Sequence, residues 1–185
     1  MGKELSEMTL AELWELFPIF LVQHDDKWKN YYKEIEASIM DLLPDYPVER
    51  ISHIGSTAIQ GTFEEWGEIP AQRGKKADME ELAHVMERNG FIGMSAETNR
   101  ISLNKGYTKE GFADKVYHIH LRYTGDNDEL YFRDYLNEHP QVAKDYESLK
   151  LELWKKYDRD AYTDAKTEFI RKWTTEARRI YGDRY

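Results

Sequence analysis

Apolar positions along this chain recur with helical spacing in an N-terminal segment, in a long segment after Asp26 and in three consecutive segments beyond residue 126. Thr9 and Glu12 have the spacing of a capping box, which predicts a short helix that ends before Pro18. Asp25 and Asp26 supply N-cap chemistry for the long helix, and Pro44 closes it. A further helix is expected over residues 78–89.

Between the helical segments, short apolar runs with alternating polarity predict strands. These runs span residues 19–23, 48–54, 91–94, 100–103 and 115–123. The last two are expected to pair as an antiparallel hairpin across a glycine-containing connection at 105–114. Residues 61–77 combine glycine, proline and charged residues, and this composition predicts a loop.

A chain of 185 residues is expected to form one domain. Its parts would be a helical extension at 1–18, a sheet part at 19–125 and helices at 126–185. The net charge of -9 argues against binding nucleic acid or anionic membranes through overall charge, although a local basic patch stays open as an alternative. The absence of cysteine excludes disulfides and thiol nucleophiles, and the short apolar runs predict no membrane span, so we expect a cytoplasmic protein.

The first candidate site is the turn Gly55-Ser56-Thr57, which follows an apolar strand. Backbone N–H groups and two hydroxyls at such a turn can hold a phosphate. The competing interpretation is a strand-to-helix turn in which a hydroxyl only caps the helix. The spacing by itself leaves both interpretations open.

The second candidate is the pair His118 and His120, whose rings point to one face of a strand because they are two residues apart. Such a pair can hold a metal, position a phosphate or simply line a half-exposed sheet face. A catalytic metal would need a third protein ligand, either a carboxylate or His53. As a lone residue, His53 also fits a structural, hydrogen-bonded histidine.

Charged residues offer further candidates. Arg133 lies at the start of the helical half, and Lys166 shares a helix face with Tyr162; either could meet a phosphate or lie on a solvated helix face. Glu64 and its neighbours Glu65 and Glu68 form the carboxylate cluster that follows the Gly-Ser turn, but a loop positions metal ligands poorly.

The ordered set of motifs resembles the GrpB family (UPF0157), whose fold is that of the nucleotidyltransferase superfamily. The matching pieces are residues 53–59, 117–121, 132–136, 146–150 and 162–170. The resemblance implies an α/β (α+β) fold: a mixed sheet flanked by helices, with a helical C-terminal half. It also implies that the Gly-Ser turn contacts a triphosphate and that Mg²⁺ serves as cofactor in active members.

The chain departs from the family pattern directly after Gly61. Family members continue with Ala-Lys-Pro and an aspartate in an apolar strand, whereas residues 62–76 here contain neither. The resemblance therefore implies binding of a nucleotide or another phosphorylated small molecule through His53, Gly55, Ser56, Thr57, Arg133 and Lys166. His118 and His120 would be the catalytic candidates if nucleotidyl transfer occurs. The alternative is a non-catalytic binding or interaction protein on the same fold.

Overall fold

The computed structural model describes residues 3–18, 21–22, 24–46, 48–60, 68–73, 76–156 and 159–185, and for residues 68–73 and 76–78 it describes the backbone. In chain order the elements are η1 (Leu5–Glu7), α1 (Leu10–Leu16), α2 (Lys27–Leu42), β1 (Arg50–Ile51), η2 (Ser56–Ala58), β2 (Glu68–Arg73), α3 (Lys76–Glu87), β3 (Ile92–Ala96), β4 (Arg100–Thr108), β5 (Gly111–Tyr123), α4 (Asp128–Glu138), α5 (Pro140–Lys156) and α6 (Arg159–Tyr181).

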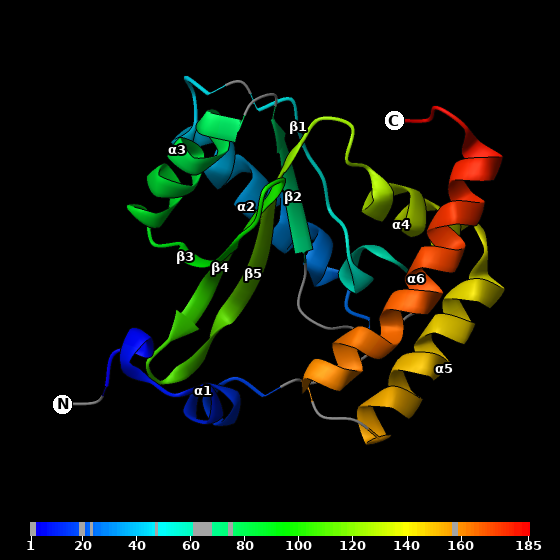
Figure 1. Ribbon diagram of the computed structural model, residues 1–185, viewed down its shortest axis with the longest axis horizontal. Helices are drawn as coiled ribbons and strands as arrows, with labels where there is room; N and C mark the ends of the chain where they lie inside the picture. The colour runs from blue at the N-terminus through cyan, green and yellow to red at the C-terminus, as the bar shows by residue number, and fades with distance from the viewer. Residues whose placement is uncertain are drawn as a thin grey trace.

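The strands form one five-stranded sheet in the order β1-β2-β5-β4-β3 (Figure 1). β2 runs parallel to β5, while the other neighbouring pairs are antiparallel. The three helices α4, α5 and α6 follow the sheet and make up the C-terminal half. The expected mixed sheet with helices and a helical C-terminal half is therefore confirmed.

The expectation of a loop over residues 61–77 is wrong for residues 68–73, which form β2 between β1 and β5. Backbone pairing on both sides fixes this strand: Arg50 lies opposite Gln72 on one side, and Glu68 lies opposite His118 on the other. Such pairing satisfies backbone groups whatever the local composition, so the glycine, proline and charges around the strand concealed it. Residues 61–67 lie outside the described part of the chain.

The β4–β5 hairpin is longer than expected, because residues 105–108 and 111–114 continue the ladder instead of forming a connection. Its register shifts between Lys105 and Tyr107, at Gly106, whose φ is 93°. A glycine adopts this backbone conformation readily, which lets the hairpin pass the irregularity and continue to the Tyr107–Phe112 pair. The glycine that suggested a break in the sequence is thus a bulge residue.

The predicted helix starts are largely confirmed. The Thr9 N–H donates to Glu12 Oε2 at 2.8 Å, and the Glu12 N–H donates to Thr9 Oγ1 at 3.3 Å, which is the capping box of α1. At α2 the Lys27 N–H donates to Asp25 Oδ1 at 2.9 Å. The strand expected over 48–54 is shorter, at Arg50–Ile51, and the strand expected over 19–23 lies partly outside the described residues.

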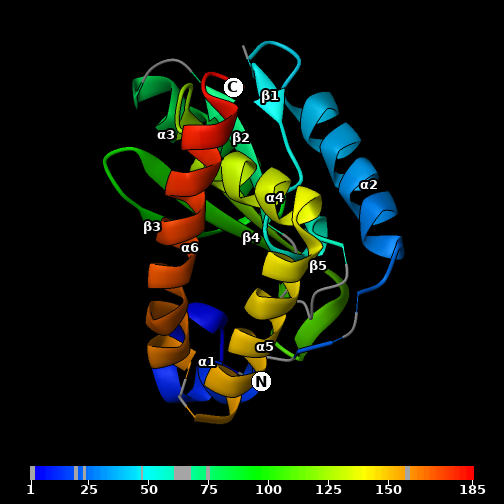
Figure 2. The same ribbon diagram turned by 90° about the vertical axis from the view of Figure 1, so that its right-hand side faces the viewer.

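The buried apolar side chains form two clusters. The first joins α2 and α3 to one face of the sheet, where Leu103, Ile119 and Leu121 have no exposed surface. The second lies among α4, α5 and α6 and includes Ile59, which directly follows η2. Each fully buried Leu or Ile contributes roughly 1.5–3 kcal/mol, so both clusters matter to stability. Figure 2 shows α2 and α6 on opposite sides of the strands.

Candidate functional site

The predicted turn Gly55-Ser56-Thr57 follows β1 and contains the start of η2. Gly55 has φ 72° and ψ -171°, a conformation that is essentially restricted to glycine. The Ala58 N–H donates to the Gly55 carbonyl at 3.2 Å, and the Ile59 N–H donates to the Ser56 carbonyl at 2.9 Å. The first N–H groups of such a helical turn have no partner within the turn itself, so they point toward its N-terminal end.

Lys150 of α5 contacts this turn directly. Its side chain has 0% relative exposure, and its Nζ donates to Ser56 Oγ at 3.0 Å. The same Nζ lies 5.0 Å from the centroid of the Tyr146 ring. The Lys150 ammonium thus lies directly beside the Gly-Ser turn.

Lys150 was not among the predicted site residues. The signal was present in the sequence, because Lys150 shares the apolar face of its helix with Tyr146 and Leu153. A lysine among buried residues is unusual, since burial of an uncompensated ammonium is costly. This spacing is a signal for a buried lysine that the sequence analysis missed, and it gives no indication of Ser56 as the partner.

Lys166, which the sequence predicts, is also buried, with 8% relative exposure, and its Nζ lies 4.2 Å from the Tyr162 ring centroid. α5 ends at Lys156 and α6 begins at Arg159, so these two ends are where the helices connect. At a rise of 1.5 Å per residue, Lys150 lies about 10 Å along α5 from its end, and Lys166 lies about 10 Å along α6 from its start. The two helices pack side by side (Figure 2). The pair of lysines is thus found at a similar level of this helical hairpin.

The side chain of His53, two residues before the turn, forms a hydrogen bond with the side chain of Thr57 in the turn. His53 Nε2 lies 2.7 Å from Thr57 Oγ1, and Thr57 has 1% relative exposure. The His53 ring stacks on Tyr32 of α2, with centroids 5.0 Å apart and planes 5° apart. Burial, with further contributions from Arg133, His24 and Lys29, lowers the pKa of His53 to about 4. The imidazole is therefore neutral at pH 7 and contributes no positive charge to the site.

Arg133 of α4 reaches the backbone just before the turn. Its Nη1 donates to the His53 carbonyl at 2.9 Å, and its Nε donates to Asp134 Oδ1 at 2.8 Å. Its Nη2 donates to the Tyr185 hydroxyl at 3.1 Å. The guanidinium thus brings its charge close to the turn while it holds the backbone of the preceding segment.

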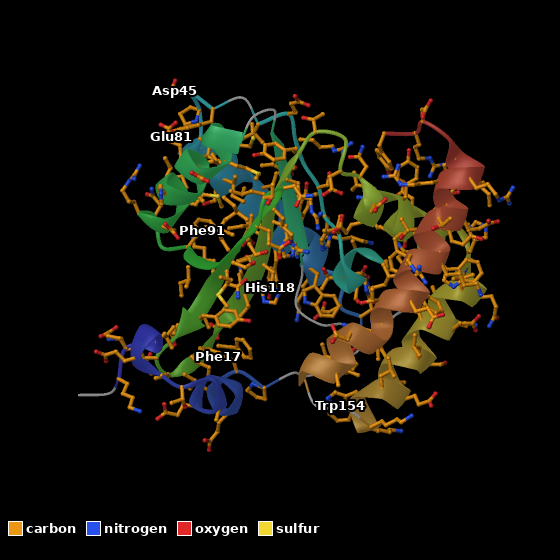
Figure 3. The ribbon with its side chains drawn as sticks, viewed as in Figure 1. Phe17, Asp45, Glu81, Phe91, His118 and Trp154 are labelled. Carbon is orange, nitrogen blue, oxygen red and sulfur yellow. The ribbon has the colours of Figure 1, made fainter. Side chains whose placement is uncertain are left out.

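His118 and His120 share one face of β5. Their neighbours Ile119 and Leu121 belong to the apolar cluster with α2 and α3, so the two rings face the other side of the sheet. His118 Nε2 lies 3.0 Å from the Tyr107 hydroxyl, and the Tyr107 ring lies 4.5 Å from the Phe17 ring, measured between centroids. Figure 3 labels His118 and Phe17. His120 Nδ1 lies 3.0 Å from Ser102 Oγ. Among the described residues, these two rings form hydrogen bonds with Tyr107 and Ser102, whereas Ser56 is bonded to Lys150.

The donor set of the described residues does not suit Mg²⁺. Within the described ranges there is no group of three or more His, Cys, Asp or Glu residues placed to hold a metal ion. At the turn, the described side-chain contacts come from an ammonium, hydroxyls and a neutral imidazole, whereas Mg²⁺ prefers carboxylate and phosphate oxygens. No catalytic step is therefore assigned to this ion.

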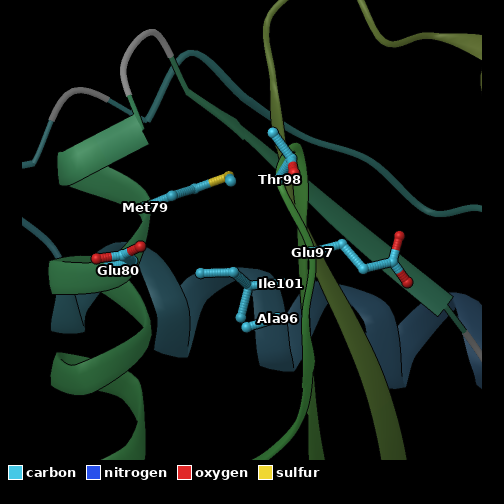
Figure 4. Close-up of a pocket in the computed structure, with 6 residues that line it drawn as sticks. All are labelled: Met79, Glu80, Ala96, Glu97, Thr98 and Ile101. Atoms are coloured by element: carbon cyan, nitrogen blue, oxygen red, sulfur yellow. The ribbon is translucent and has the colours of Figure 1, made fainter.

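A separate hollow of about 240 Å³ lies between α3 and the β3–β4 turn (Figure 4). Met79, Ala96 and Ile101 contribute to its lining, together with Glu80, Glu97 and Thr98. β3 is at the opposite edge of the sheet from β1, which leads to the Gly-Ser turn. The hollow contains none of the predicted site residues and is distinct from the candidate site.

A comparison with protein families matches residues 18–176 to "GrpB protein". The chain belongs to the GrpB family. Glutamate-rich protein GrpB of Alkalihalophilus pseudofirmus is 32% identical over 165 residues, which cover 82% of this chain and 91% of the relative. UPF0157 protein YqkA of Bacillus subtilis is 25% identical over 178 residues, which cover 92% of this chain and 51% of YqkA.

The crystal structure of the conserved protein GrpB from Enterococcus faecalis has the same fold as this GrpB family member. The TM-score is 0.74 at 23% identity, with 88% of this chain and 99% of that chain covered. The Cid1 poly(U) polymerase is more distant, with a TM-score of 0.48 at 13% identity over 78% of this chain and 45% of that chain. No conclusion about activity follows from that similarity. Within the described residues, no helix combines the length and apolar character needed to cross a membrane.

Proposed function

We propose that this GrpB family member binds a nucleotide or another phosphorylated small molecule at the Gly55-Ser56-Thr57 turn. The observation that supports this most is the hydrogen bond from the buried Lys150 ammonium to Ser56 Oγ, at 3.0 Å. A phosphate at the turn would meet a hydroxyl, helical N–H groups and a positive charge together. These are the groups that recur in protein phosphate sites.

The surrounding charges favour an anion. Lys166 lies at a similar level of the α5–α6 hairpin as Lys150, and the Arg133 guanidinium lies against the backbone beside the turn. The chain as a whole is acidic, with a net charge of -9, so these cations form a local feature. Partly buried charges are screened less by salt than exposed ones, which strengthens their attraction for a phosphate.

We further propose that binding occurs without nucleotidyl transfer. Transfer by metal-bridged phosphates needs converging carboxylates. Residues 61–77, which include β2, lack the aspartate that the family pattern carries in an apolar strand, and their carboxylates are Glu64, Glu65 and Glu68 instead. The backbone register places Glu68 opposite His118 and Pro70 opposite His120. In this proposal His118 and His120 contact the ligand beyond its phosphates, so replacing both by Ala changes affinity and no rate.

The test is a calorimetric titration of the whole chain with inorganic pyrophosphate and with nucleoside triphosphates. We expect Lys150→Met to weaken binding about 10- to 100-fold, since hydrogen bonds to charged groups contribute about 1.5–3 kcal/mol. Lys144→Met is the matched control, because Lys144 is an exposed lysine of the same helix. No heat of binding from any of these ligands, or equal affinities for the two variants, would contradict the proposal.

A further inference from the structure

Helix α4 holds the backbone on both sides of the Gly-Ser turn. Arg133 and Asn137 are one helical turn apart and therefore share a face of α4. Arg133 Nη1 donates to the His53 carbonyl, which precedes the turn, at 2.9 Å. Asn137 Nδ2 donates to the Ala58 carbonyl at 2.9 Å, and the Gln60 N–H donates to Asn137 Oδ1 at 3.0 Å.

The Asn137 amide uses one donor and one acceptor toward the same stretch of backbone, as a neighbouring strand would do. Such paired bonds fix both the position and the orientation of the segment that they hold. Gly55 can adopt many backbone conformations, so it does not by itself fix the path of the chain into the turn. The hydrogen bonds from α4 therefore add to those within the segment, such as the one from the Ala58 N–H to the Gly55 carbonyl.

We propose that Asn137 is a positioning residue for the phosphate site: it holds residues 58–60 and thereby fixes the neighbouring Ser56, whose hydroxyl accepts a hydrogen bond from Lys150. Arg133 holds the other end of the same segment at His53. The effect of Asn137 on ligand affinity rests on the proposed function. Its hydrogen bonds to the backbone of residues 58–60 do not depend on that proposal. A preorganised turn binds more tightly because less conformational freedom is lost on binding.

The variant Asn137→Ala tests both parts. Asn137 is exposed and lies within a helix, and Ala is a better helix former than Asn, so the fold should persist. Gln141→Ala is the control, since Gln141 is an exposed amide at the start of α5 that donates to Asp145 Oδ1 at 3.0 Å. Urea unfolding of both variants should give free energies close to that of the parent chain.

Hydrogen–deuterium exchange of the unliganded protein tests the hold directly. In Asn137→Ala, the peptide that spans residues 53–60 should exchange at least about fivefold faster, because Gln60 loses its acceptor and the segment gains freedom. The same peptide in Gln141→Ala should exchange at the parent rate. Unchanged exchange in Asn137→Ala would overturn the inference whether or not the protein binds any ligand.

Titration with inorganic pyrophosphate tests the positioning role. We expect Asn137→Ala to bind about tenfold more weakly than the parent chain, with Gln141→Ala unchanged. Faster exchange combined with equal affinity would show that Asn137 supports the backbone without affecting the site, and would overturn the positioning role. Absence of binding by the parent chain would refute the proposed function. The exchange experiment would then test only whether Asn137 restrains the backbone of residues 53–60.

Discussion

The partly buried imidazole of His53 makes the stability of this protein depend on pH in a defined direction. Burial lowers its pKa from 6.5 to about 4, so the folded chain resists a proton that the unfolded chain accepts. Between pH 6.5 and 4 the unfolded state therefore binds more protons at this residue than the folded state. The free energy of unfolding is expected to fall as the pH falls through this window, and to be unaffected by His53 above it.

The magnitude follows from the size of the shift. A change from 6.5 to about 4 corresponds to about 3 kcal/mol once the pH reaches the folded-state value. At pH 5, where His53 is mostly protonated in the unfolded chain and mostly neutral in the folded chain, the loss is about 2 kcal/mol. That is a large part of the net stability of an ordinary domain, which is about 5–15 kcal/mol.

The assay is urea unfolding at pH 7 and pH 5, with His53→Gln as the comparison. Gln lacks the titration but places an amide near the position of Nε2, within reach of Thr57 Oγ1. Carboxylates titrate in both proteins, so the difference between the two pH effects isolates His53. The parent chain should lose about 2 kcal/mol more than the variant between pH 7 and pH 5. Equal losses would refute a lowered pKa for His53.

Three further substitutions, two in the sheet and one after α3, are measured by urea unfolding. Gly106→Ala should cost more than about 2 kcal/mol, because its φ is 93° and a Cβ would lie 2.2 Å from the Lys115 carbonyl oxygen. Gly90→Ala, with φ 86° and no atom within 4 Å of the added Cβ, should cost only about 1–2 kcal/mol. If Gly106→Ala costs no more than Gly90→Ala, the hairpin backbone moves enough to relieve the contact with Lys115. Leu103→Ala should cost about 2–5 kcal/mol, since Leu103 has 0% exposure in the first cluster; a loss below about 1 kcal/mol would mean that the core closes around the cavity.

The sequence predicted those elements whose stabilising interactions are local. Thr9 and Glu12 cap their own helix, and the apolar faces of α4, α5 and α6 repeat with helical spacing. The shared face of His118 and His120 also follows from a local rule, because alternate residues of a strand point the same way.

Features that depend on distant parts of the chain could not be predicted in this way. β2 is fixed by pairing with β1 and β5, and its own composition predicts a loop. Lys150 lies 94 positions from Ser56, so helical spacing, which places this lysine on an apolar face, does not indicate its partner. The resemblance to a family covers residues 146–150, yet the contact of Lys150 with the turn is seen only in the structure, where α5 and the turn lie together.

The Gly-Ser turn lies where the two apolar clusters meet. On one side His53 stacks on Tyr32 of α2, which packs against the first cluster. On the other side Ser56 accepts a hydrogen bond from Lys150 of α5, and Ile59 belongs to the second cluster. Arg122 of β5 makes a further connection, because it pairs with Asp126 at 2.7 Å and with Glu129 of α4. A ligand at the turn would therefore contact groups supplied by both halves, and its binding energy would depend on their relative position as well as on the turn itself.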